Sequence, residues 1–321
     1  MREFTVNEAA KRLLEAENAY ILIHRSPDGD CIGSGYALAL ALRSQGKKAK
    51  VLCSDAIPER YHFMLPEAET IEHFEPDIII SADVADEKLI GDTLFEQYAG
   101  KTDLCIDHHI SNTGYAKELC LDGNAAAACQ VVYEILKAMN ISVTREMAVC
   151  LYTGLATDTG CFMYDNVSPR TLRIAAEIME QYPDIPYAAI NRNMFIVKSM
   201  GRMQLDSILT KQLESYADGK CMLVCITKEL MDKYGIDESE LDGVAGFPLQ
   251  VEGAEVGIVL KEREKNFFRI SMRSADKVNV SDICKCFGGG GHIKAAGCSI
   301  EASAEDAKRM LVEAVMKGMQ K

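Results

Sequence analysis

Short apolar runs alternate with helical patterns over the first half of the chain. Each run has the length of a buried parallel strand. The runs occupy residues 20–24, 51–53, 77–82 and 104–106. Helical spacing of apolar residues is found over residues 32–44, 125–139 and 146–156. Strands that alternate with helices in this way predict an α/β fold, in which a parallel sheet carries helices on both faces.

Three helix starts carry capping signals. Thr5 is followed three residues later by Glu8, which predicts a capping box. Ser168 precedes Pro169, and proline suits the first position of a helix. Ser303 predicts the start of a terminal helix.

The pattern changes near residue 182, where two prolines fall within four residues. A polar, methionine-rich stretch with helical spacing follows over residues 199–216. Three further apolar runs, a glycine cluster and the terminal helix complete the chain. We therefore expect a first domain over residues 1–185, a linker helix over residues 186–215, and a second, smaller α/β domain over residues 216–321.

Composition and charge narrow the class of protein. Hydrophobic residues make up 48% of the 321 residues and charged residues 26%, which excludes a disordered chain. The formal net charge of −13 predicts repulsion of long polyanions, so we expect no sequence-independent binding of duplex DNA. The 12 cysteines form no C-x-x-C pair, which argues against zinc knuckles and fits a reducing cytosol.

The chain shows no membrane signal. Arg2, Glu3 and Glu8 interrupt the first turns, so we expect no signal peptide. The longest apolar stretches, residues 36–42 and 125–129, fall far short of the ~20 residues that cross a bilayer. We therefore expect a cytoplasmic protein that does not bind a membrane.

Polar residues cluster at the ends of four predicted elements. The segments are His24-Arg25-Ser26-Pro27-Asp28-Gly29-Asp30, Asp83, Asp107-His108-His109 and Asp158-Thr159-Gly160. They contain three of the six histidines of the chain. Ligands of α/β proteins bind beyond the carboxyl ends of the strands, which is where three of these segments fall.

These residue types suit divalent metal ions. Asp28 and Asp30 lie two apart, so in an extended loop their side chains would point in different directions and could serve different ions. Asp83 comes from another strand end and could bridge two ions. Together with Asp158 these carboxylates would balance two divalent cations, and mixed imidazole and carboxylate ligands suit Mn²⁺. Such a site is typical of two-metal hydrolysis of a phosphate ester.

Each segment alone has a plainer interpretation. Asp28 and Asp30 could be turn residues, and Asp83 could cap the next helix. The two adjacent histidines could be buried structure, and Asp158 could lie at a helix C-terminus. Four such segments at loop ends, with half of the histidines, favour the metal site.

A glycine cluster marks the second domain. Gly288–Gly291 precede His292, and Ala295-Ala296-Gly297 follow. Successive glycines let backbone N–H groups converge on an anion, although four glycines also suit a flexible loop. Arg273, at the end of an apolar run, could pair with the same anion or could be a surface arginine.

The ordered motifs resemble the DHH phosphoesterase superfamily. They are His24-x3-Asp28-x-Asp30 with Gly33-Ser34, then Asp83, Asp107-His108-His109 and Asp158-Thr159-Gly160. Two further motifs resemble the DHH-associated C-terminal nucleotide-binding domain of that superfamily. They are Arg273-Ser274 and Gly289–His292 with Ala295-Ala296-Gly297. The two-domain layout is similar to that of NrnA-type oligoribonucleases (nanoRNases), which also dephosphorylate 3′-phosphoadenosine 5′-phosphate (PAP).

The resemblance implies two divalent metal ions, Mn²⁺ by preference. One ion would be held by His24, Asp28 and Asp83, and the other by Asp30, Asp83, His108 and Asp158. His109 would face the substrate phosphate as general acid or electrostatic stabiliser, while Asp107 would orient the histidines. Groups of the second domain would bind the far phosphate of the nucleotide: Arg273, Ser274, His292 and the backbone of Gly289, Gly290 and Gly291.

The resemblance also implies a reaction. Short oligoribonucleotides and linear dinucleotides such as pApA and pGpG would be hydrolysed to nucleoside monophosphates, and PAP to AMP, by a protein that forms a homodimer. The alternatives are a cyclic dinucleotide phosphodiesterase and a nucleotide-binding sensor without turnover. A RecJ-like exonuclease would need a basic channel with aromatic stacking, which this acidic chain without tryptophan does not predict.

Overall fold

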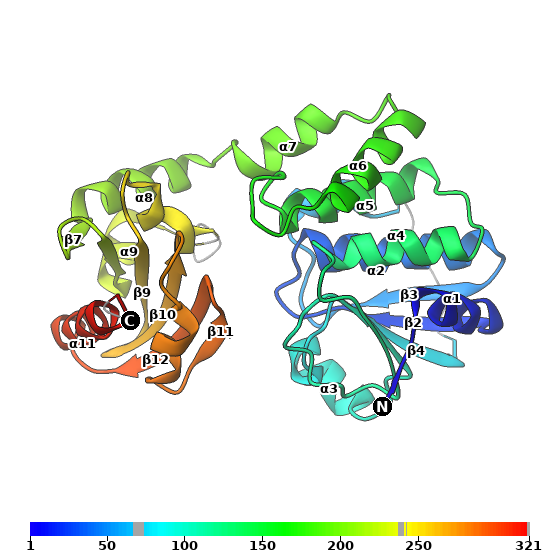
Figure 1. The fold of residues 1–321 in the computed structure, drawn as a ribbon, viewed down its shortest axis with the longest axis horizontal. Coiled ribbons are helices and arrows are strands. Elements are labelled where there is room, and N and C mark those ends of the chain that lie inside the picture. The colour runs from blue at the N-terminus through cyan, green and yellow to red at the C-terminus, as the bar shows by residue number, and fades with distance from the viewer. Residues whose placement is uncertain (67–73, 237–240, 242, 320–321) are drawn as a thin grey trace. The chain divides into compact units, whose positions relative to one another are not determined.

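Residues 1–197 fold around a six-stranded parallel sheet (Figure 1). In the computed structural model, which describes residues 1–66, 74–236, 241 and 243–319, the remaining residues form a second compact unit. The strands of the first unit are β1 (Arg2–Glu3), β2 (Asn18–Leu22), β3 (Lys48–Leu52), β4 (Ile78–Ala82), β5 (Leu104–Asp107) and β6 (Glu118–Leu121). Its α-helices are α1 (Val6–Glu15), α2 (Gly29–Ser44), α3 (Asp92–Tyr98), α4 (Ala128–Ala138), α5 (Arg145–Asp158), α6 (Pro169–Gln181) and α7 (Tyr187–Phe195), with short 3-10 helices η1 (Glu59–Met64) and η2 (Glu87–Ile90).

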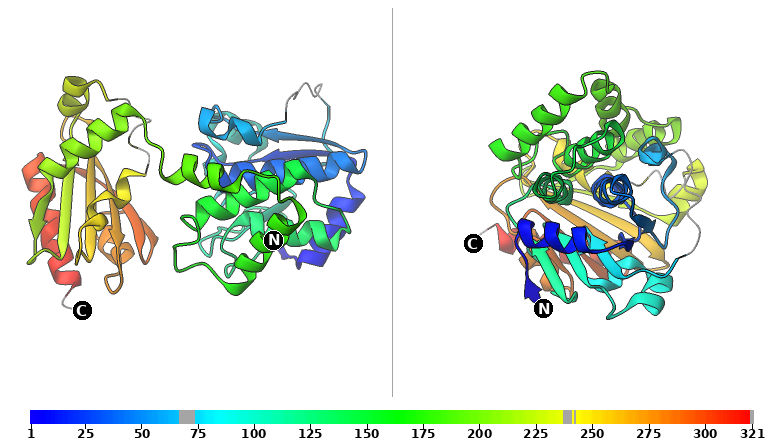
Figure 2. Two further views of the ribbon diagram at one scale, coloured as in Figure 1. Left: turned by 90° about the horizontal axis from the view of Figure 1, so that it is seen from above. Right: turned by 90° about the vertical axis from the view of Figure 1, so that its right-hand side faces the viewer.

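Helices cover both faces of this sheet, as the sequence predicts. Helices α2, α4 and α5 form a thick layer over one face, and its main core contains Ile21, Ile80 and Leu104 (Figure 1). On the other face, α3 and η2 enclose a smaller core with Leu22 and Val84. Figure 2 shows the thick helical layer end-on, on one side of the strands. Burial from both sides explains why the strands are short continuous apolar runs.

The order of the strands creates the place for a ligand. The sheet runs β1-β6-β5-β4-β2-β3, and every neighbouring pair of strands is parallel. The chain leaves β2 toward β3 on one side, whereas β4 and β5 lie on the other side of β2. In open parallel sheets a crevice forms at such a reversal, outside the carboxyl ends of the two strands. Here that point lies beyond the ends of β2 and β4.

Helices α2 and α5 pack unusually close together. A Cβ atom at Gly33 of α2 would lie 2.5 Å from the backbone oxygen of Cys150 in α5. At Gly154 of α5, a Cβ would lie 2.2 Å from Cys129 Sγ and 2.9 Å from Asp30 Oδ1. Two glycines therefore let these helices approach, and the approach brings the start of α2 near the end of α5.

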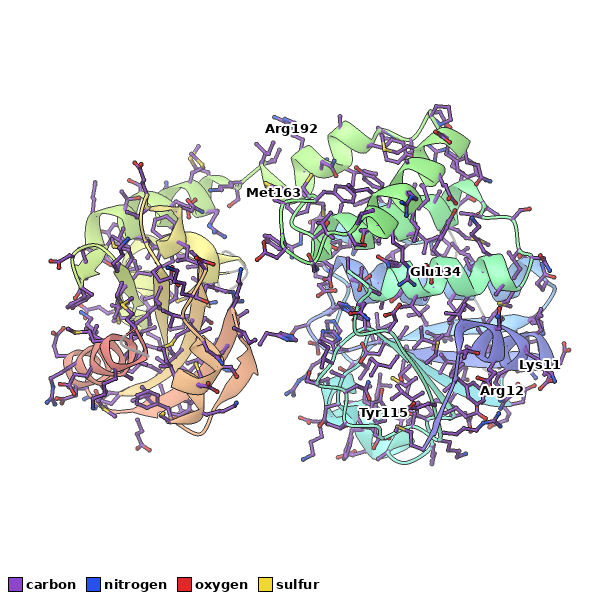
Figure 3. The ribbon with its side chains drawn as sticks, viewed as in Figure 1. Lys11, Arg12, Tyr115, Glu134, Met163 and Arg192 are labelled. Atoms are coloured by element: carbon purple, nitrogen blue, oxygen red, sulfur yellow. The ribbon has the colours of Figure 1, made fainter. Side chains whose placement is uncertain are left out.

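The capping signals in the sequence are confirmed. Thr5 and Glu8 form the capping box at the start of α1, and the Ser168 side chain accepts a hydrogen bond at the start of α6, where Pro169 is the first helical residue. Helix α6 is tied to α4 through Arg170, which donates to Glu134 (labelled in Figure 3).

Residues 198–321 form the second unit, which is built on a mixed six-stranded sheet. Its strands are β7 (Glu214–Tyr216), β8 (Cys221–Ile226), β9 (Val256–Glu264), β10 (Phe267–Ser274), β11 (Gly290–His292) and β12 (Ala295–Glu301). Its helices are α8 (Met200–Gln212), α9 (Lys228–Tyr234), the 3-10 helix η4 (Val244–Gln250), α10 (Val280–Lys285) and α11 (Ala304–Gly318), which Ser303 caps. The order is β11-β12-β10-β9-β8-β7, with only β8 and β9 parallel among the described strands.

The sheet of the second unit has two different faces. Residues Val256, Ile258 and Leu260 of β9 point to a core with α10 and α11. On the opposite face, Val259 packs into a second core with α8, α9 and η4. Along β10 and β12, every second residue belongs to the core with α10 and α11. The residues between them are not among the buried residues of either core.

Some elements differ from the sequence expectations. The helix expected over residues 199–216 ends at Gln212, because Leu213 is extended and β7 then pairs with β8. The expected linker over residues 186–215 contains α7, whose Tyr187 packs in the first core, and α8, whose Leu205 packs in the second unit. The two compact units meet in the sequence at Val197.

No described helix is both long and apolar enough to span a membrane.

Candidate metal centre

The predicted metal-binding side chains gather beyond the carboxyl ends of the strands of the first unit. His24 lies two residues after β2, and Asp83 follows β4 directly. Asp107 is the last residue of β5, so the two histidines after it leave the same edge of the sheet. Asp158 is the last residue of α5, which reaches this edge from the helical layer.

The geometry of Asp28 and Asp30 differs from the expected extended loop. Asp28 is the N-cap of α2, and its Oδ1 accepts hydrogen bonds from the N–H groups of Asp30 and Cys31 at 3.0 Å. Asp30 lies in the first helical turn. The helix begins here because a carboxylate at the N-cap satisfies two of its free N–H groups. The helical turn, and not a pleated backbone, directs the two carboxylates apart.

A first group of possible ligands forms around His24. Its Nε2 lies 3.7 Å from Asp28 Oδ1 and 3.7 Å from Asp83 Oδ2. The Cys31 thiol belongs to the same group, since one ligand atom each of His24, Asp28 and Cys31 lie within 4.8 Å of one another. The sequence analysis missed Cys31. Its position three residues after Asp28, one helical turn on, was the available signal.

A second group forms around His108. Its Nε2 lies 3.2 Å from Asp158 Oδ2, 3.5 Å from Asp83 Oδ1 and 3.8 Å from Asp30 Oδ2. Asp83 therefore approaches the histidines of both groups, one with each carboxylate oxygen. The Asp83 backbone adopts a left-handed conformation with φ of 58°, an uncommon geometry that Asp tolerates better than most residues and that concentrates at functional sites.

Two atoms at the centre of the cluster make no hydrogen bond although they are buried. They are Asp83 Oδ1 and His108 Nε2. An unsatisfied buried polar atom costs about 1–3 kcal/mol, so such atoms call for a ligand. Imidazole nitrogen and carboxylate oxygen are donors for divalent ions, and the residues present therefore fit a divalent metal ion.

The electrostatics agree with a site built for cations. Burial lowers the pKa of His108, but the carboxylates of Asp158 and Asp83 outweigh it and raise the pKa to about 12. Burial likewise lowers the pKa of His24, which Asp28 and then Asp83 raise to about 9. In the absence of metal, protons on these imidazoles provide the positive charge that the carboxylates require.

The pKa values of the carboxyl groups are shifted by the same burial and the same neighbouring charges. Burial, and then the charges of Asp83 and Asp158, raise the pKa of Asp30 well above its usual range. Burial is the largest of the causes that raise the pKa of Asp158 to about 6. The hydrogen bond to His108 lowers this pKa, and the charge of Asp83 raises it. The pKa of Asp28 is lowered, because its bonds to His24 and to the start of α2 outweigh burial.

Outer contacts hold the possible ligands in place. Both oxygens of Asp30 accept from the start of α4, from Ala128 N at 2.5 Å and Cys129 N at 2.9 Å. Helix α4 has no side-chain cap of its own, so Asp30 serves as its cap from a distant part of the chain. His108 Nδ1 lies 3.2 Å from the backbone oxygen of Ala125, which orients the ring.

Asp107 supports the two histidines from behind. Its Oδ1 accepts from His108 N at 2.8 Å and lies 2.8 Å from His109 Nδ1. Its Oδ2 accepts from Asn112 Nδ2 at 2.6 Å, a residue that the sequence analysis missed. Nearby, the Tyr115 hydroxyl (labelled in Figure 3) donates to Ser81 Oγ at 2.6 Å and joins β4 to the segment after β5. His109 N also donates to Asp107 Oδ1 at 3.3 Å, so Asp107 is held by four groups and orients His109.

The remaining predicted residues lie in the second unit. The register pairs Arg273 of β10 with Ala295 of β12, and Ala295 with His292 of β11, so these side chains form one row on one face. Ser274 is buried. Gly290 and Gly291 belong to the edge strand β11, and not to a flexible loop. An edge strand leaves alternate backbone N–H groups available to an anion.

Comparisons with known proteins agree with this architecture. The model of the DHH family, N-terminal domain, matches residues 18–155, and that of the DHHA1 domain matches residues 219–319. The bifunctional oligoribonuclease and PAP phosphatase NrnA of Thermus thermophilus is 30% identical over 302 residues, which cover 92% of this chain and 88% of the relative.

Solved structures are similar as well. The exopolyphosphatase-related protein from Bacteroides fragilis has a TM-score of 0.87 at 26% identity, and the likeness covers 97% of this chain and 95% of that one. RecJ from Thermus thermophilus, solved in complex with Mn²⁺, has a TM-score of 0.50 at 13% identity over 97% of this chain and 55% of RecJ. The chain belongs to the DHH family and carries a DHHA1 domain in its second unit.

Proposed function

We propose that the protein is a two-metal phosphoesterase that hydrolyses short oligoribonucleotides and linear dinucleotides to nucleoside monophosphates, and PAP to AMP. The observation that carries the proposal is the pair of buried atoms without hydrogen bonds at the centre of the cluster, Asp83 Oδ1 and His108 Nε2. The name of the Thermus thermophilus relative supports the substrate class. Short substrates also suit a chain whose net charge of −13 disfavours long nucleic acids.

We propose Mn²⁺ as the metal and two ions as the number. One ion would be held by His24 and Asp28. The other would be held by His108, Asp30 and Asp158. Asp83 would contact both ions. Four carboxylates offset the charge of two divalent cations, and the mixed donor set suits Mn²⁺ better than structural zinc. Bound ions would neutralise the phosphate charge and lower the pKa of the attacking water.

The protein's own groups would complete the proton transfers. His109 Nδ1 is fixed by Asp107, which leaves Nε2 as the atom that can meet the substrate. Burial lowers the pKa of His109, but Asp107 and Asp83 outweigh it and raise the pKa overall, which favours the protonated imidazole that a proton donor needs. As water attacks phosphorus and the P–O ester bond breaks, the leaving oxygen would take the His109 proton. Asp107 would act as the positioning residue.

In the second unit, the row of Arg273 and His292 would bind a phosphate of the nucleotide. The guanidinium offers charge-assisted hydrogen bonds to phosphate oxygens. The N–H groups of edge strand β11, at Gly290 and Gly291, would add neutral donors.

The test is hydrolysis of 5′-phosphorylated diadenylate (pApA) in Mn²⁺, followed by chromatography. We expect AMP from the wild type and a loss of about 100-fold or more in Asp83→Asn, because the bridging charge is removed while the side-chain shape is kept. The matched control is Asp92→Asn, which removes the same charge from an exposed position at the start of α3. The control should keep wild-type turnover.

Three other results would overturn the proposal. Binding of pApA in Mn²⁺ without turnover would identify a nucleotide sensor. Turnover of inorganic pyrophosphate or polyphosphate, but not of pApA or PAP, would show that the substrates are inorganic and not nucleotides. Polyphosphate must be among the tested substrates because of the name of the Bacteroides fragilis relative. Preference for cyclic over linear dinucleotides would identify a cyclic dinucleotide phosphodiesterase.

A further inference from the structure

The loop that follows α5 continues directly from the candidate metal centre. It covers residues 159–167 and starts at the residue after Asp158. Gly160, Cys161 and Phe162 have φ values of 56°, 57° and 63°. A left-handed conformation is uncommon for a residue with a side chain, and it persists only where the surrounding structure holds it. The shape of this loop is therefore specified by its contacts.

Hydrogen bonds and packing supply these contacts. The backbone oxygen of Thr159 accepts from the N–H of Tyr164 at 3.0 Å, which closes the first part of the loop. Asn166 Nδ2 donates to the backbone oxygen of Asp158 at 3.1 Å and ties the second part to the end of α5. The Phe162 ring packs against the core of the first unit. The loop is thus anchored to the element that carries Asp158.

The ring of Tyr164 is supported on one face. A Cβ atom at Gly160 would stand 2.3 Å from Cζ, 2.4 Å from Cε1 and 2.8 Å from Cε2 of this ring. The nearest atoms are three ring carbons and do not include the hydroxyl oxygen, so the backbone of Gly160 lies against a face of the ring. Only a residue without a side chain permits this approach. Tyr164 is nevertheless 60% exposed, so the opposite face is open to solvent.

This open aromatic face lies close to the candidate metal centre. Two residues of extended chain span at most ~7 Å, so the Cα atom of Gly160, on which the ring rests, lies within this distance of that of Asp158. The neighbouring Met163 (labelled in Figure 3) is 74% exposed and adds a polarisable apolar side chain to the same loop. A phosphate bound at the metals would therefore have an apolar, aromatic surface beside it.

A nucleobase is the group that fits such a surface. In a nucleotide only the sugar separates the base from the phosphate, so a bound phosphate places the base within reach of the loop. Every base has a flat face that stacks on an aromatic ring. A ring that is already held by Gly160 loses little conformational entropy when a base stacks on it. An inorganic phosphate chain has no flat apolar group and would leave Tyr164 in water.

We propose that the open face of Tyr164 stacks on the base of the nucleotide whose phosphate is bound at the metal centre. This proposal rests on the proposed function, which places that phosphate at the metals. It makes Tyr164 a specificity-determining residue that favours nucleotides over other phosphate esters, and Gly160 the residue that supports the ring.

Binding without turnover tests the stacking directly. Calorimetry of the full chain in Mn²⁺ would compare AMP with ribose 5-phosphate, which has the same phosphate and sugar but no base. We expect the wild type to bind AMP about tenfold more tightly. Tyr164→Leu should weaken AMP about tenfold and leave ribose 5-phosphate unchanged, whereas Tyr164→Phe should keep wild-type affinities. The control Tyr234→Leu removes an exposed tyrosine from α9 of the second unit and should change neither affinity.

A purely structural role of Tyr164 would give a different result. Mn²⁺ affinity and Tm of Tyr164→Leu should equal those of the wild type, because Asn166 still holds the end of α5. Equal loss of AMP and ribose 5-phosphate binding would show that Tyr164 only shapes the loop, and would overturn the proposal. Equal affinity of the wild type for the two ligands, or no binding of either, would overturn it without any variant.

Kinetics then distinguish this proposal from the proposed function. In Tyr164→Leu we expect kcat/KM for pApA to fall about tenfold. The loss should vanish for one of two pApA analogues, each of which lacks one adenine, because only the base that stacks is affected. If the wild type hydrolyses no nucleotide, the proposed function fails, and the calorimetry still decides the stacking. If the wild type hydrolyses pApA and Tyr164→Leu matches it, or the loss persists with both analogues, the stacking proposal alone fails.

Discussion

Replacing Gly33 by alanine tests the link between the helix crossing and the metal centre. In an ordinary helix interior this change stabilises a protein by about 1 kcal/mol, because glycine loses more backbone entropy on folding. At Gly33 the new Cβ would stand 2.5 Å from the Cys150 backbone oxygen and 2.8 Å from Cys129 Sγ. A backbone oxygen cannot rotate away, so α2 and α5 must separate.

The expected magnitude follows from these two opposing effects. Overpacking of a close helix crossing costs about 1–3 kcal/mol, which exceeds the gain in helix propensity. We expect a net destabilisation of about 1–2 kcal/mol, or a fall in Tm of about 2–8 °C for a unit of this size. Because α2 carries Asp28 and Asp30 and α5 carries Asp158, the separation should also weaken Mn²⁺ binding.

Thermal unfolding with and without Mn²⁺ measures both effects. Gly35→Ala is the comparison within the same helix, since its Cβ would meet the side-chain methyl of Ile23 at 2.8 Å instead of a backbone atom. We expect a smaller loss there, because a side chain can shift. A Gly33→Ala protein that melts above wild type and binds Mn²⁺ normally would refute the reasoning.

Further predictions concern the metal and the groups around it. Mn²⁺ at 100 times its Kd should stabilise the wild type by about 2.7 kcal/mol, and calorimetry should show no such gain in Asp83→Asn. The pKa of His24 is raised from its ordinary 6.5 to about 9, so the stability that its proton gives the metal-free protein is present at pH 6 and lost as the pH rises through 9. Metal binding needs the neutral imidazole, so the Mn²⁺-induced rise in Tm should grow between pH 6 and 9, and a flat profile would contradict the assignment of His24. Asn112→Ala removes the 2.6 Å hydrogen bond to Asp107 and should lower kcat for pApA about tenfold while Tm falls by only a few degrees; an unchanged kcat would show that Asp107 needs no such support.

The general architecture could be predicted from local patterns because the strands are buried on both faces. Residues 77–82 and 104–106 are apolar runs of strand length, and both are strands in the structure, β4 and β5. The strand β6 was missed, because its four residues, Glu118–Leu121, include only a buried pair and do not form a long run. The strand β11 was hidden in the glycine cluster, where pairing with β12 overrides the low strand propensity of glycine.

The candidate site could be anticipated in its segments but not in its contacts. A polar residue after an apolar strand marks the edge of a sheet where ligands bind, so Asp83 and His108 could be named from order alone. The role of Cys31 could have been inferred only once Asp28 was known to start a helix, and the role of Asn112 depends on a loop that folds back, which leaves no periodic signal. The contact of Asp30 with the start of α4 joins residues 98 positions apart, and no local pattern specifies it.

That long-range contact explains why the acidic cluster is compatible with a folded protein. Asp30 is fully buried beside Asp83, which would be unfavourable for two carboxylates without compensation. The N–H groups of Ala128 and Cys129 donate to Asp30, and the positive end of the α4 dipole faces the same carboxylate. The two oxygens of Asp83 instead face His24 and His108. The donors of α4 thus offset only part of the cost of burying Asp30, whose pKa stays raised, whereas Asp83 has an imidazole beside each of its oxygens. We therefore expect a bound cation to act mainly at Asp83, while the hydrogen bonds from α4 to Asp30 hold the start of α2 in place.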